Sequence, residues 1–255
     1  MRVKVLGCSG GIGAGLRTTA ILIDDDILID AGTGIGDLSL PELRRIRHVF
    51  LTHSHLDHTA GLPLFTDSIF DTLMMRALQV YGRVETLRAI QDHIFNDVMW
   101  PDFSMIPSKE NPALRYNEIA PGDVIEFDNV ALRAVNVHHS VPAVGYLIEA
   151  NNKVIAFSGD TMTNQTLWPV LNDCDRLEAL VIEVSFPDSQ EELATMSGHY
   201  CPRTLAEDLG KLSHDPEIWV TAMKPGGEDI IFAEVLQALR GRKVQRLRRG
   251  DCFEL

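Results

Sequence analysis

The chain has 255 residues, a formal net charge of −13 and a hydrophobic content of 45%. This length is sufficient for one large α/β domain with a substantial core. The acidic composition argues against stable binding of duplex nucleic acid, which needs a basic surface. It does not exclude a small anionic substrate, because bound metal ions can dominate the local field.

Neither membrane insertion nor secretion is indicated. No apolar run is long enough to cross a membrane, and residues 1–7 have a strand pattern without the apolar core of a signal peptide. The four cysteines are scattered and lack paired spacing, which favours reduced thiols over disulfides. We therefore expect a cytoplasmic protein with no membrane partner.

The first residues predict short strands joined by a glycine-rich loop. Residues 2–6 and 19–23 are predicted strands, and the glycines of residues 7–15 lie between them. The glycine spacing does not fit a dinucleotide-binding motif, and no helical pattern follows it. We therefore expect this loop to let the backbone pass close to the floor of a site.

The following elements lead toward a polar motif. A strand at residues 27–29 pairs with residues 19–23 in a predicted hairpin and ends at Asp30. Residues 39–47 predict a short helix that begins near a proline, and the apolar residues 48–51 predict a buried strand.

Four metal-ligand side chains follow this buried strand within six residues, in the stretch His53-Ser54-His55-Leu56-Asp57-His58. Alternation places His53 and His55 on one side, while Asp57 and His58 can face a second point in space. Imidazole nitrogens and carboxylate oxygens suit zinc, and also iron or manganese. A histidine-rich surface loop is the alternative interpretation, and the density of ligands argues against it.

The middle of the chain has a helical pattern. Apolar residues at positions 84, 87, 90, 94 and 98 predict one helix, on which His93 is a packed or exposed side chain. The segment Trp100-Pro101-Asp102-Phe103 ends this helix. It either lines a pocket or packs its aromatic rings over the helix end.

Strand patterns resume at residues 124–127 and 130–137, and the second of these runs into His138 and His139. Strand alternation places the two histidines on opposite sides. We interpret His138 as a structural residue or as a support for the site.

Two further buried strands run into acidic residues. Residues 154–157 precede Asp160, and residues 179–183 end in Glu183. Asp30 also follows an apolar hairpin, so in both halves of the chain an apolar hairpin is followed by an aspartate. This similarity indicates an internal duplication.

The last part of the chain predicts two helices and two strands. A helix at residues 202–212 follows His199, and residues 217–221 form the last core strand. A helix at 230–239 and a short strand near 244–247 come next. The basic residues near this end are Arg240, Arg242, Lys243, Arg246, Arg248 and Arg249. They either contact nucleic acid or form a solvated face that offsets the acidic body, and the second interpretation is favoured.

The His-x-His-x-Asp-His motif after a strand resembles the metallo-β-lactamase superfamily. With Gly61 and Leu62 following it, the motif is similar to the signature of class II cyclic nucleotide phosphodiesterases, and ribonuclease Z is a neighbouring family. The resemblance covers nearly the whole chain. It implies an α/β fold, a four-layer αββα sandwich, in one domain of residues 1–255 with a helical insertion at about 67–112.

The resemblance also implies a site for two divalent metal ions, with zinc expected and manganese or iron as alternatives. The first ion would be bound by His53, His55 and His139. The second would be bound by Asp57, His58 and Asp160, with Asp160 bridging the two ions.

Three residues have implied catalytic roles. Asp57 would orient a water molecule that the two ions activate, and His199, oriented by Glu183, would protonate the departing oxygen. A helix-capping role for His199 is the alternative. Asp30 resembles the early aspartate of the superfamily, which supports the histidine loop.

The chain departs from its relatives at one ligand position. The relatives read Thr-His-x-Lys-Pro, whereas this chain has Thr221-Ala222-Met223-Lys224-Pro225. Alanine has no donor atom, so the resemblance implies that Ala222 weakens the second metal site. Ala222 is either an engineered replacement or a natural change.

The function that the resemblance implies is hydrolysis of a small phosphodiester, a cyclic nucleotide such as 3′,5′-cyclic AMP or cyclic GMP. A ribonuclease Z-like nuclease is one alternative, but the sequence contains no Gly/Pro-rich arm for tRNA and its net charge is unfavourable. A metal-poor, inactive relative that binds nucleotides is another, because of Ala222. The resemblance also implies a homodimer.

Overall fold

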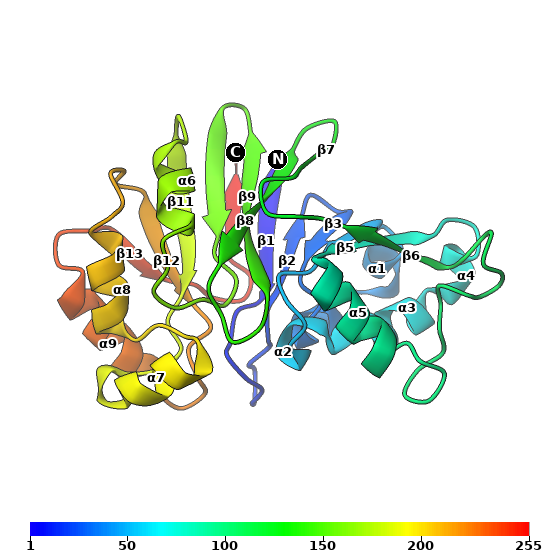
Figure 1. The fold of residues 1–255 in the computed structure, drawn as a ribbon, viewed down its shortest axis with the longest axis horizontal. Coiled ribbons are helices and arrows are strands. Elements are labelled where there is room, and N and C mark those ends of the chain that lie inside the picture. Colours follow the sequence, from blue (N-terminus) through cyan, green and yellow to red (C-terminus); the bar gives the residue numbers. More distant parts are fainter. Residues whose placement is uncertain (255) are drawn as a thin grey trace.

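Two seven-stranded β-sheets pack face to face between two outer layers of helices in the computed structural model, which describes residues 1–254 (Figure 1). The helices of the amino-terminal half cover the right-hand sheet in Figure 1, and those of the carboxyl-terminal half cover the left-hand sheet. This arrangement confirms the four-layer αββα sandwich expected from the sequence.

The first sheet combines the amino-terminal half with the last strand of the chain. Its strands, in sheet order, are β14 (Cys252–Glu254), β1 (Arg2–Gly7), β2 (Ala20–Ile23), β3 (Ile27–Ile29), β4 (His48–Phe50), β5 (Leu78–Gly82) and β6 (Leu114–Glu118). The second sheet contains β13 (Val244–Arg246), β12 (Glu217–Thr221), β11 (Leu177–Glu183), β10 (Lys153–Phe157), β9 (Ala143–Ala150), β8 (Ala131–Val137) and β7 (Val124–Glu126).

The helices are mostly short. Those of the first half are η1 (Thr33–Asp37), α1 (Leu40–Leu43), α2 (Leu56–Thr59), α3 (Gly61–Ser68), α4 (Phe70–Leu73) and α5 (Val84–His93). Those of the second half are α6 (Leu167–Asn172), η2 (Asp188–Gln190), α7 (Glu191–Ser197), α8 (Pro202–Leu209) and α9 (Glu228–Ala238).

The two halves have the same strand pattern. An antiparallel hairpin, β2–β3, is followed by the parallel strands β4, β5 and β6 in the first half. The hairpin β9–β10 is followed by the parallel strands β11, β12 and β13 in the second. This repetition supports the internal duplication, and parallel strands place their carboxyl ends at one edge of each sheet.

Three apolar clusters separate the four layers. The central cluster lies between the sheets and includes the buried residues Ile29 of β3, Phe50 of β4 and Tyr146 of β9. One outer cluster packs the first sheet against its helices, through residues such as Phe65 of α3. The other outer cluster packs the second sheet against α6, α8 and α9.

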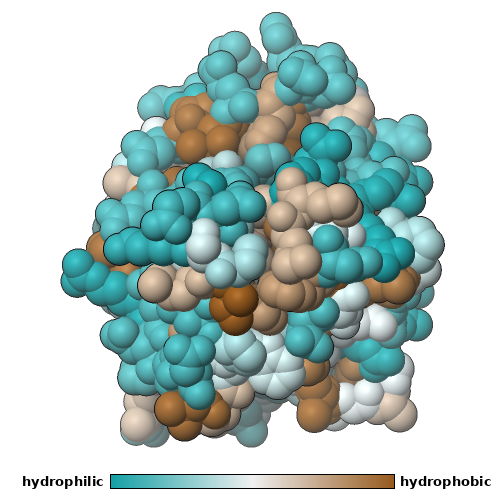
Figure 2. All heavy atoms as spheres, turned by 90° about the vertical axis from the view of Figure 1, so that its right-hand side faces the viewer, coloured by the Kyte–Doolittle hydropathy of each residue, from teal (hydrophilic) through white to brown (hydrophobic). Residues whose placement is uncertain are grey.

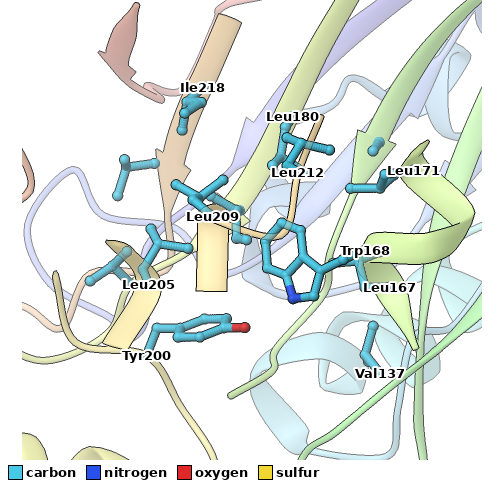
Figure 3. Close-up of a cluster of buried hydrophobic side chains, with 14 of the residues drawn as sticks. Val137, Leu167, Trp168, Leu171, Leu180, Tyr200, Leu205, Leu209, Leu212 and Ile218 are labelled. Atoms are coloured by element: carbon cyan, nitrogen blue, oxygen red, sulfur yellow. The ribbon is translucent and has the colours of Figure 1, made fainter. Parts of the chain in front are cut away.

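Part of the cluster in the second half is shown in Figure 3. Trp168 of α6 and Leu205 of α8 are fully buried there, together with Leu180 of β11 and Ile218 of β12. Tyr200, which directly follows His199 in the chain, belongs to the same cluster. The packing of this layer therefore fixes a residue next to a predicted catalytic histidine.

The helix predicted over positions 84–98 ends earlier, at His93. Asn96 accepts hydrogen bonds from the backbone nitrogens of Val98 and Met99, at 3.1 and 2.8 Å, and Asp97 has a φ of 60°. This turn ends the helical run, because a left-handed residue cannot continue a right-handed helix. The side chain of Val98 is consequently 87% exposed.

The expected helical insertion at about 67–112 also contains a strand of the sheet. Within this range, β5 lies between β4 and β6 and pairs with both in parallel. The hydrophobic alternation of a five-residue strand was masked in the sequence by the helical patterns on either side.

The Trp100–Phe103 segment packs over the helical layer. Phe103 is buried, and its ring stacks on Phe70 at a centroid distance of 5.3 Å and lies 6.0 Å from the ring of Phe95. Trp100 packs against the same cluster. Of the two interpretations of this segment, these contacts support the packing of aromatic rings over the helix end and not the lining of a pocket.

The face over these helices is mixed in polarity. In Figure 2, brown apolar patches are separated by teal hydrophilic side chains. Exposed apolar residues of this half include Leu64, Met74 and Met75. Within residues 1–254, no helix combines the length and apolar character needed to span a membrane, and the four cysteines are free thiols.

We predict that Leu205→Ala lowers the free energy of unfolding by about 2–5 kcal/mol, because it opens a cavity in a fully buried cluster. Leu193→Ala is the matched control, since the Leu193 side chain on α7 is 47% exposed, and its effect should stay within about 0.5 kcal/mol. Urea unfolding measures both. Equal effects of the two substitutions would contradict the packing described for α8.

Candidate metal centre

The predicted ligands follow strand ends at one edge of the sandwich. The loop after β4 carries His53 and His55, and helix α2, which follows it, carries His58. The loop after β8 carries His139, and the loop after β10 carries Asp160. Ligand atoms lie within 4.8 Å of one another in three groups: His53, His55 and His139; His53, His58 and Asp160; and His139, Asp160 and His199. The structure therefore brings together residues 53, 55, 58, 139 and 160.

The first group consists of three imidazoles. Nδ1 of His55 lies 3.2 Å from Nε2 of His139, and the ring centroid of His53 is 4.6 Å from that of His55 and 4.8 Å from that of His139. Nε2 of His53 is buried and has no hydrogen-bond partner among the described residues. A buried nitrogen without a partner is costly unless a metal ion or another group satisfies it.

In two of these rings, hydrogen bonds fix which nitrogen is free. Nδ1 of His139 donates to the carbonyl of Gly198 at 2.8 Å, which leaves Nε2 as the ligand atom. Oγ1 of Thr52 donates to Asp30 and therefore accepts from Nδ1 of His53 at 2.9 Å, which leaves Nε2 of that ring free. Supporting contacts of this kind orient metal-binding histidines.

The electrostatic environment keeps these rings neutral. Burial lowers the pKa of His53 well below its ordinary value, and burial also lowers the pKa of His139 to about 4. The pKa of His55 is lowered by burial as well. Neutral imidazoles present a lone pair, so the donor set fits a divalent ion such as zinc.

The second group is centred on the Asp160 carboxylate. Its Oδ2 lies 3.3 Å from Nε2 of His58 and 3.9 Å from Nε2 of His53. Burial opposes a charge on His58, but the carboxylates of Asp160 and Asp30 raise its pKa well above the ordinary value. A positive charge is therefore favoured between these two acids, and a metal ion at this point would supply it.

Asp57 lies at the margin of this group. Its Oδ2 is 3.9 Å from Nε2 of His58, and its side chain is 31% exposed. Among residues 1–254, Asp57 belongs to none of the groups whose ligand atoms gather within 4.8 Å. The sequence-based assignment of Asp57 as a ligand of the second ion remains a prediction.

Asp30 supports the histidine loop through hydrogen bonds to Thr52 and His58. Its buried carboxylate accepts from the backbone nitrogen of Thr52 at 2.8 Å, from the Thr52 hydroxyl at 2.8 Å and from Nδ1 of His58 at 2.7 Å. Its φ of 56° lies in the left-handed region, which aspartate tolerates better than most residues. These contacts agree with the supporting role expected for Asp30.

His199 is paired with Glu183. Nδ1 of His199 lies 2.8 Å from Oε1 of Glu183, and the same oxygen accepts from the backbone nitrogens of Thr161 and Tyr200 at 3.2 and 3.3 Å. Burial opposes protonation of His199, but the charge of Glu183 and the hydrogen bond to it raise the pKa of His199. This pair can hold a proton beside Asp160, whose Oδ2 is 4.0 Å from Nδ1 of His199.

Two supporting residues were missed in the sequence. Oγ of Ser185 lies 3.1 Å from Oε2 of Glu183 and 3.2 Å from Nδ1 of His199. The buried carboxylate of Asp208 accepts from the Tyr200 hydroxyl at 2.6 Å, from Nε1 of Trp168 at 3.1 Å and from Nζ of Lys211 at 2.6 Å. The only sequence signal for Asp208 was its helical position three residues before Lys211, which is typical of a surface ion pair.

Ala222 directly follows β12, at the position where the sequence resemblance implies a histidine ligand. It is 4% exposed and has a φ of 60°. Its backbone nitrogen donates to the carbonyl of Cys8 at 2.9 Å, and its carbonyl accepts from Ser185 at 3.0 Å. A Cβ on Gly10 would lie 2.2 Å from this carbonyl oxygen, which confirms that the glycine loop allows a close backbone approach.

The chain was compared with known families and proteins. The profile of a family described as "Beta-lactamase superfamily domain" matches residues 25–215. A probable 3′,5′-cyclic-nucleotide phosphodiesterase of Yersinia pestis is 25% identical over 252 residues, covering 82% of this chain and 71% of the relative. A ribonuclease Z of Haloarcula marismortui is 27% identical over 164 residues, covering 60% and 49%.

The fold is also similar to solved structures. Unliganded yeast PDE1 superposes with a TM-score of 0.80 at 18% identity, covering 100% of this chain and 99% of that one. At this identity the likeness concerns the fold alone.

We predict that Asp30→Asn weakens zinc binding about 10- to 100-fold, because the histidine loop loses its charged supporting partner. Asparagine tolerates the left-handed backbone, so the fold should persist. Asp24→Asn is the matched control, since Asp24 also has a positive φ, 47°, but lies in the turn between β2 and β3. Competition with a metal indicator measures the affinities, and equal values for both variants would contradict the role of Asp30.

Proposed function

The chain belongs to the β-lactamase superfamily, and from this premise we propose that it is a metal-dependent phosphodiesterase that hydrolyses a 3′,5′-cyclic nucleotide. The observation that carries the proposal is the His199–Glu183 pair, at 2.8 Å, beside a group of histidine and aspartate ligands. The relative from Yersinia pestis, named as a probable phosphodiesterase of this type, supports the choice of substrate.

The residues present fit two divalent ions. His53, His55 and His139 would bind the first, and His58, Asp160 and Asp57 would bind the second, with Asp160 shared. When bound, such ions lower the pKa of a water molecule and offset the charge of a phosphate.

The protein's own contribution is to hold protons in place. Glu183 engages Nδ1 of His199, so a second proton on the ring is carried at Nε2. The raised pKa of His199 keeps the ring protonated to higher pH than an ordinary histidine. Nε2 can then donate a proton to the ribose oxygen that leaves phosphorus. The partly exposed carboxylate of Asp57 would accept a hydrogen bond from the attacking water.

A ribonuclease Z-like activity is the second candidate, supported by relatives with that name. Both activities are tested by assaying the purified protein with cyclic AMP, cyclic GMP and a precursor tRNA. The number of metal ions bound per chain is measured on the same sample. Hydrolysis of a cyclic nucleotide is the expected result. Cleavage of the tRNA alone would favour the nuclease, and no turnover with bound nucleotide would favour an inactive binding protein.

We predict that His199→Ala lowers kcat about 100-fold or more and leaves metal content nearly unchanged, because the imidazole acts as a proton donor to a poor leaving group. His93→Ala, at the end of helix α5 and outside these ligand groups, is the control and should keep both quantities. Metal loss in the His199 variant would instead assign His199 to the ligand group that it forms with His139 and Asp160.

We also predict that Ala222→His adds about one metal ion per chain and raises turnover, because it supplies the missing donor of a two-metal site. Histidine is among the residues that tolerate the positive φ at this position. Ala222→Asn, which fits the backbone but lacks an imidazole, is the matched control. If the protein already binds two ions and the histidine changes neither quantity, Ala222 is not the ligand position.

A further inference from the structure

A buried carboxylate on α8 lies outside the candidate metal centre and takes no part in the reaction proposed above. Asp208 is 2% exposed, and its Oδ2 accepts hydrogen bonds from the Tyr200 hydroxyl at 2.6 Å and from Nε1 of Trp168 at 3.1 Å. The backbone nitrogen of Asn164 donates to the same oxygen at 3.0 Å, and Nζ of Lys211 donates to Oδ1 at 2.6 Å. Figure 3 shows the Tyr200 hydroxyl and the Trp168 indole nitrogen on the same side of the apolar cluster. Aspartate is almost never buried in this way unless its charge is paired.

The Asp208 carboxylate is charged despite its burial. Burial raises its pKa, but hydrogen bonds from Lys211, Tyr200 and the Asn164 backbone outweigh this effect and hold the pKa below its ordinary value. The ammonium of Lys211, on a side chain that is 33% exposed, supplies the opposite charge. A buried ion pair is often no more stabilising than apolar packing of similar volume. The contribution of Asp208 is therefore expected in the geometry that it fixes.

Asp208 and Lys211 together hold the loop that carries Asp160. Asp208 accepts from the backbone nitrogen of Asn164, and Nζ of Lys211 donates to the Asn164 carbonyl at 3.1 Å. The side-chain amide of Asn164 donates in turn to Oγ1 of Thr161, the residue after Asp160, at 3.3 Å. Asn164 is thus fixed through its backbone and its side chain, four residues after a predicted metal ligand.

The same carboxylate holds the segment that carries His199. The ring of Tyr200 is fully buried, and its hydroxyl donates to Asp208. At the other end of the residue, the backbone nitrogen of Tyr200 donates to Oε1 of Glu183 at 3.3 Å, the oxygen that lies 2.8 Å from Nδ1 of His199. Because His199 directly precedes Tyr200, the placement of its ring depends on both acids.

We propose that Asp208 is a positioning residue, which fixes the distance between the imidazole of His199 and the carboxylate of Asp160. This inference rests on the function proposed above, in which His199 donates a proton and Asp160 binds the metal ions. Nδ1 of His199 lies 4.0 Å from Oδ2 of Asp160, and one oxygen of Asp208 connects the two segments that carry them. A proton donor must lie within hydrogen-bond reach of the leaving oxygen, and a misplacement of about 1 Å can lower the rate about 100-fold.

The test compares two substrates that differ in their need for a proton donor. The ribose oxygen of cyclic AMP is a poor leaving group, whereas 4-nitrophenolate leaves bis(4-nitrophenyl) phosphate without a proton. Asp208→Asn replaces one of the two acceptor oxygens by an amide, and Tyr200→Phe removes a single hydroxyl. In the zinc-loaded protein, each should lower kcat for cyclic AMP about tenfold or more, a part of the ~100-fold that a proton donor contributes. Both should leave kcat for bis(4-nitrophenyl) phosphate nearly unchanged.

Two controls separate positioning from a general loss of stability. Leu205→Ala destabilises the same helix without removing a hydrogen bond of Asp208, so it should leave the ratio of the two kcat values unchanged. In a His199→Ala background, Asp208→Asn should cause no further loss with cyclic AMP, because a positioning residue acts through the group that it positions.

Thermal unfolding shows which variants fold, and Tyr200→Phe, which keeps the buried ring, decides the question alone if Asp208→Asn does not fold. Equal losses with both substrates would assign Asp208 a structural role only and overturn the proposal. An unchanged kcat with cyclic AMP, or an additive loss in the double variant, would also overturn it.

Hydrogen exchange separates this inference from the proposed function. The amides of Asn164 and Tyr200 should exchange faster in both variants relative to the amides of β11, whereas a global loss of stability would accelerate all of them. Faster exchange at these two amides, without hydrolysis of cyclic nucleotides by the unmodified protein, would reject the proposed function and leave Asp208 as the residue that holds the two segments. Unchanged exchange in a protein that hydrolyses cyclic AMP would reject the role of Asp208 alone.

Discussion

The metal-binding edge depends on one buried carboxylate, that of Asp30. It accepts three hydrogen bonds from the Thr52–His58 loop, and two of these determine which nitrogens of His53 and His58 face the site. Because the group is buried at the end of β3, its hydrogen bonds are stronger than in water and costly to leave unmade. The left-handed backbone of Asp30 is retained for the same reason, since its strain is offset by the contacts that it permits.

In the second half of the molecule, two buried acids, Glu183 and Asp208, support the segments that carry the site residues. Glu183 connects the Asp160 loop to the His199 segment through Thr161 and the backbone of Tyr200. Asp208 connects the same two segments one layer further out, through Asn164 at 3.0 Å and the Tyr200 hydroxyl at 2.6 Å. The outer helical layer therefore helps to hold the His199–Glu183 pair in position.

The parts of the site that could be predicted from the sequence are those encoded locally. His53, His55 and His58 follow one strand at fixed spacing, and Asp160 and Glu183 each follow a buried apolar run. The contribution of Asp208 could not be predicted, because Asn164 and Trp168 are brought to it by packing between distant segments. The contact of Ser185 with His199 likewise joins two segments. The early end of α5 was missed because the Asn96 turn interrupts an apolar periodicity that continues to Val98. The pairing of β14 with β1 joins the two ends of the chain, a contact for which no local pattern exists.

The carboxylates around His58 favour a positive charge at the candidate metal centre. Its ring lies between the carboxylates of Asp30 and Asp160, at 2.7 and 3.3 Å, and these acids raise its pKa well above the ordinary value. The rings of His53 and His139 lie a few ångström away, and burial lowers their pKa values. Among His53, His58 and His139 a proton is therefore favoured on His58, whereas a divalent ion would use the lone pairs of these rings and satisfy the unpaired Nε2 of His53. Metal binding at this point must displace the proton from His58.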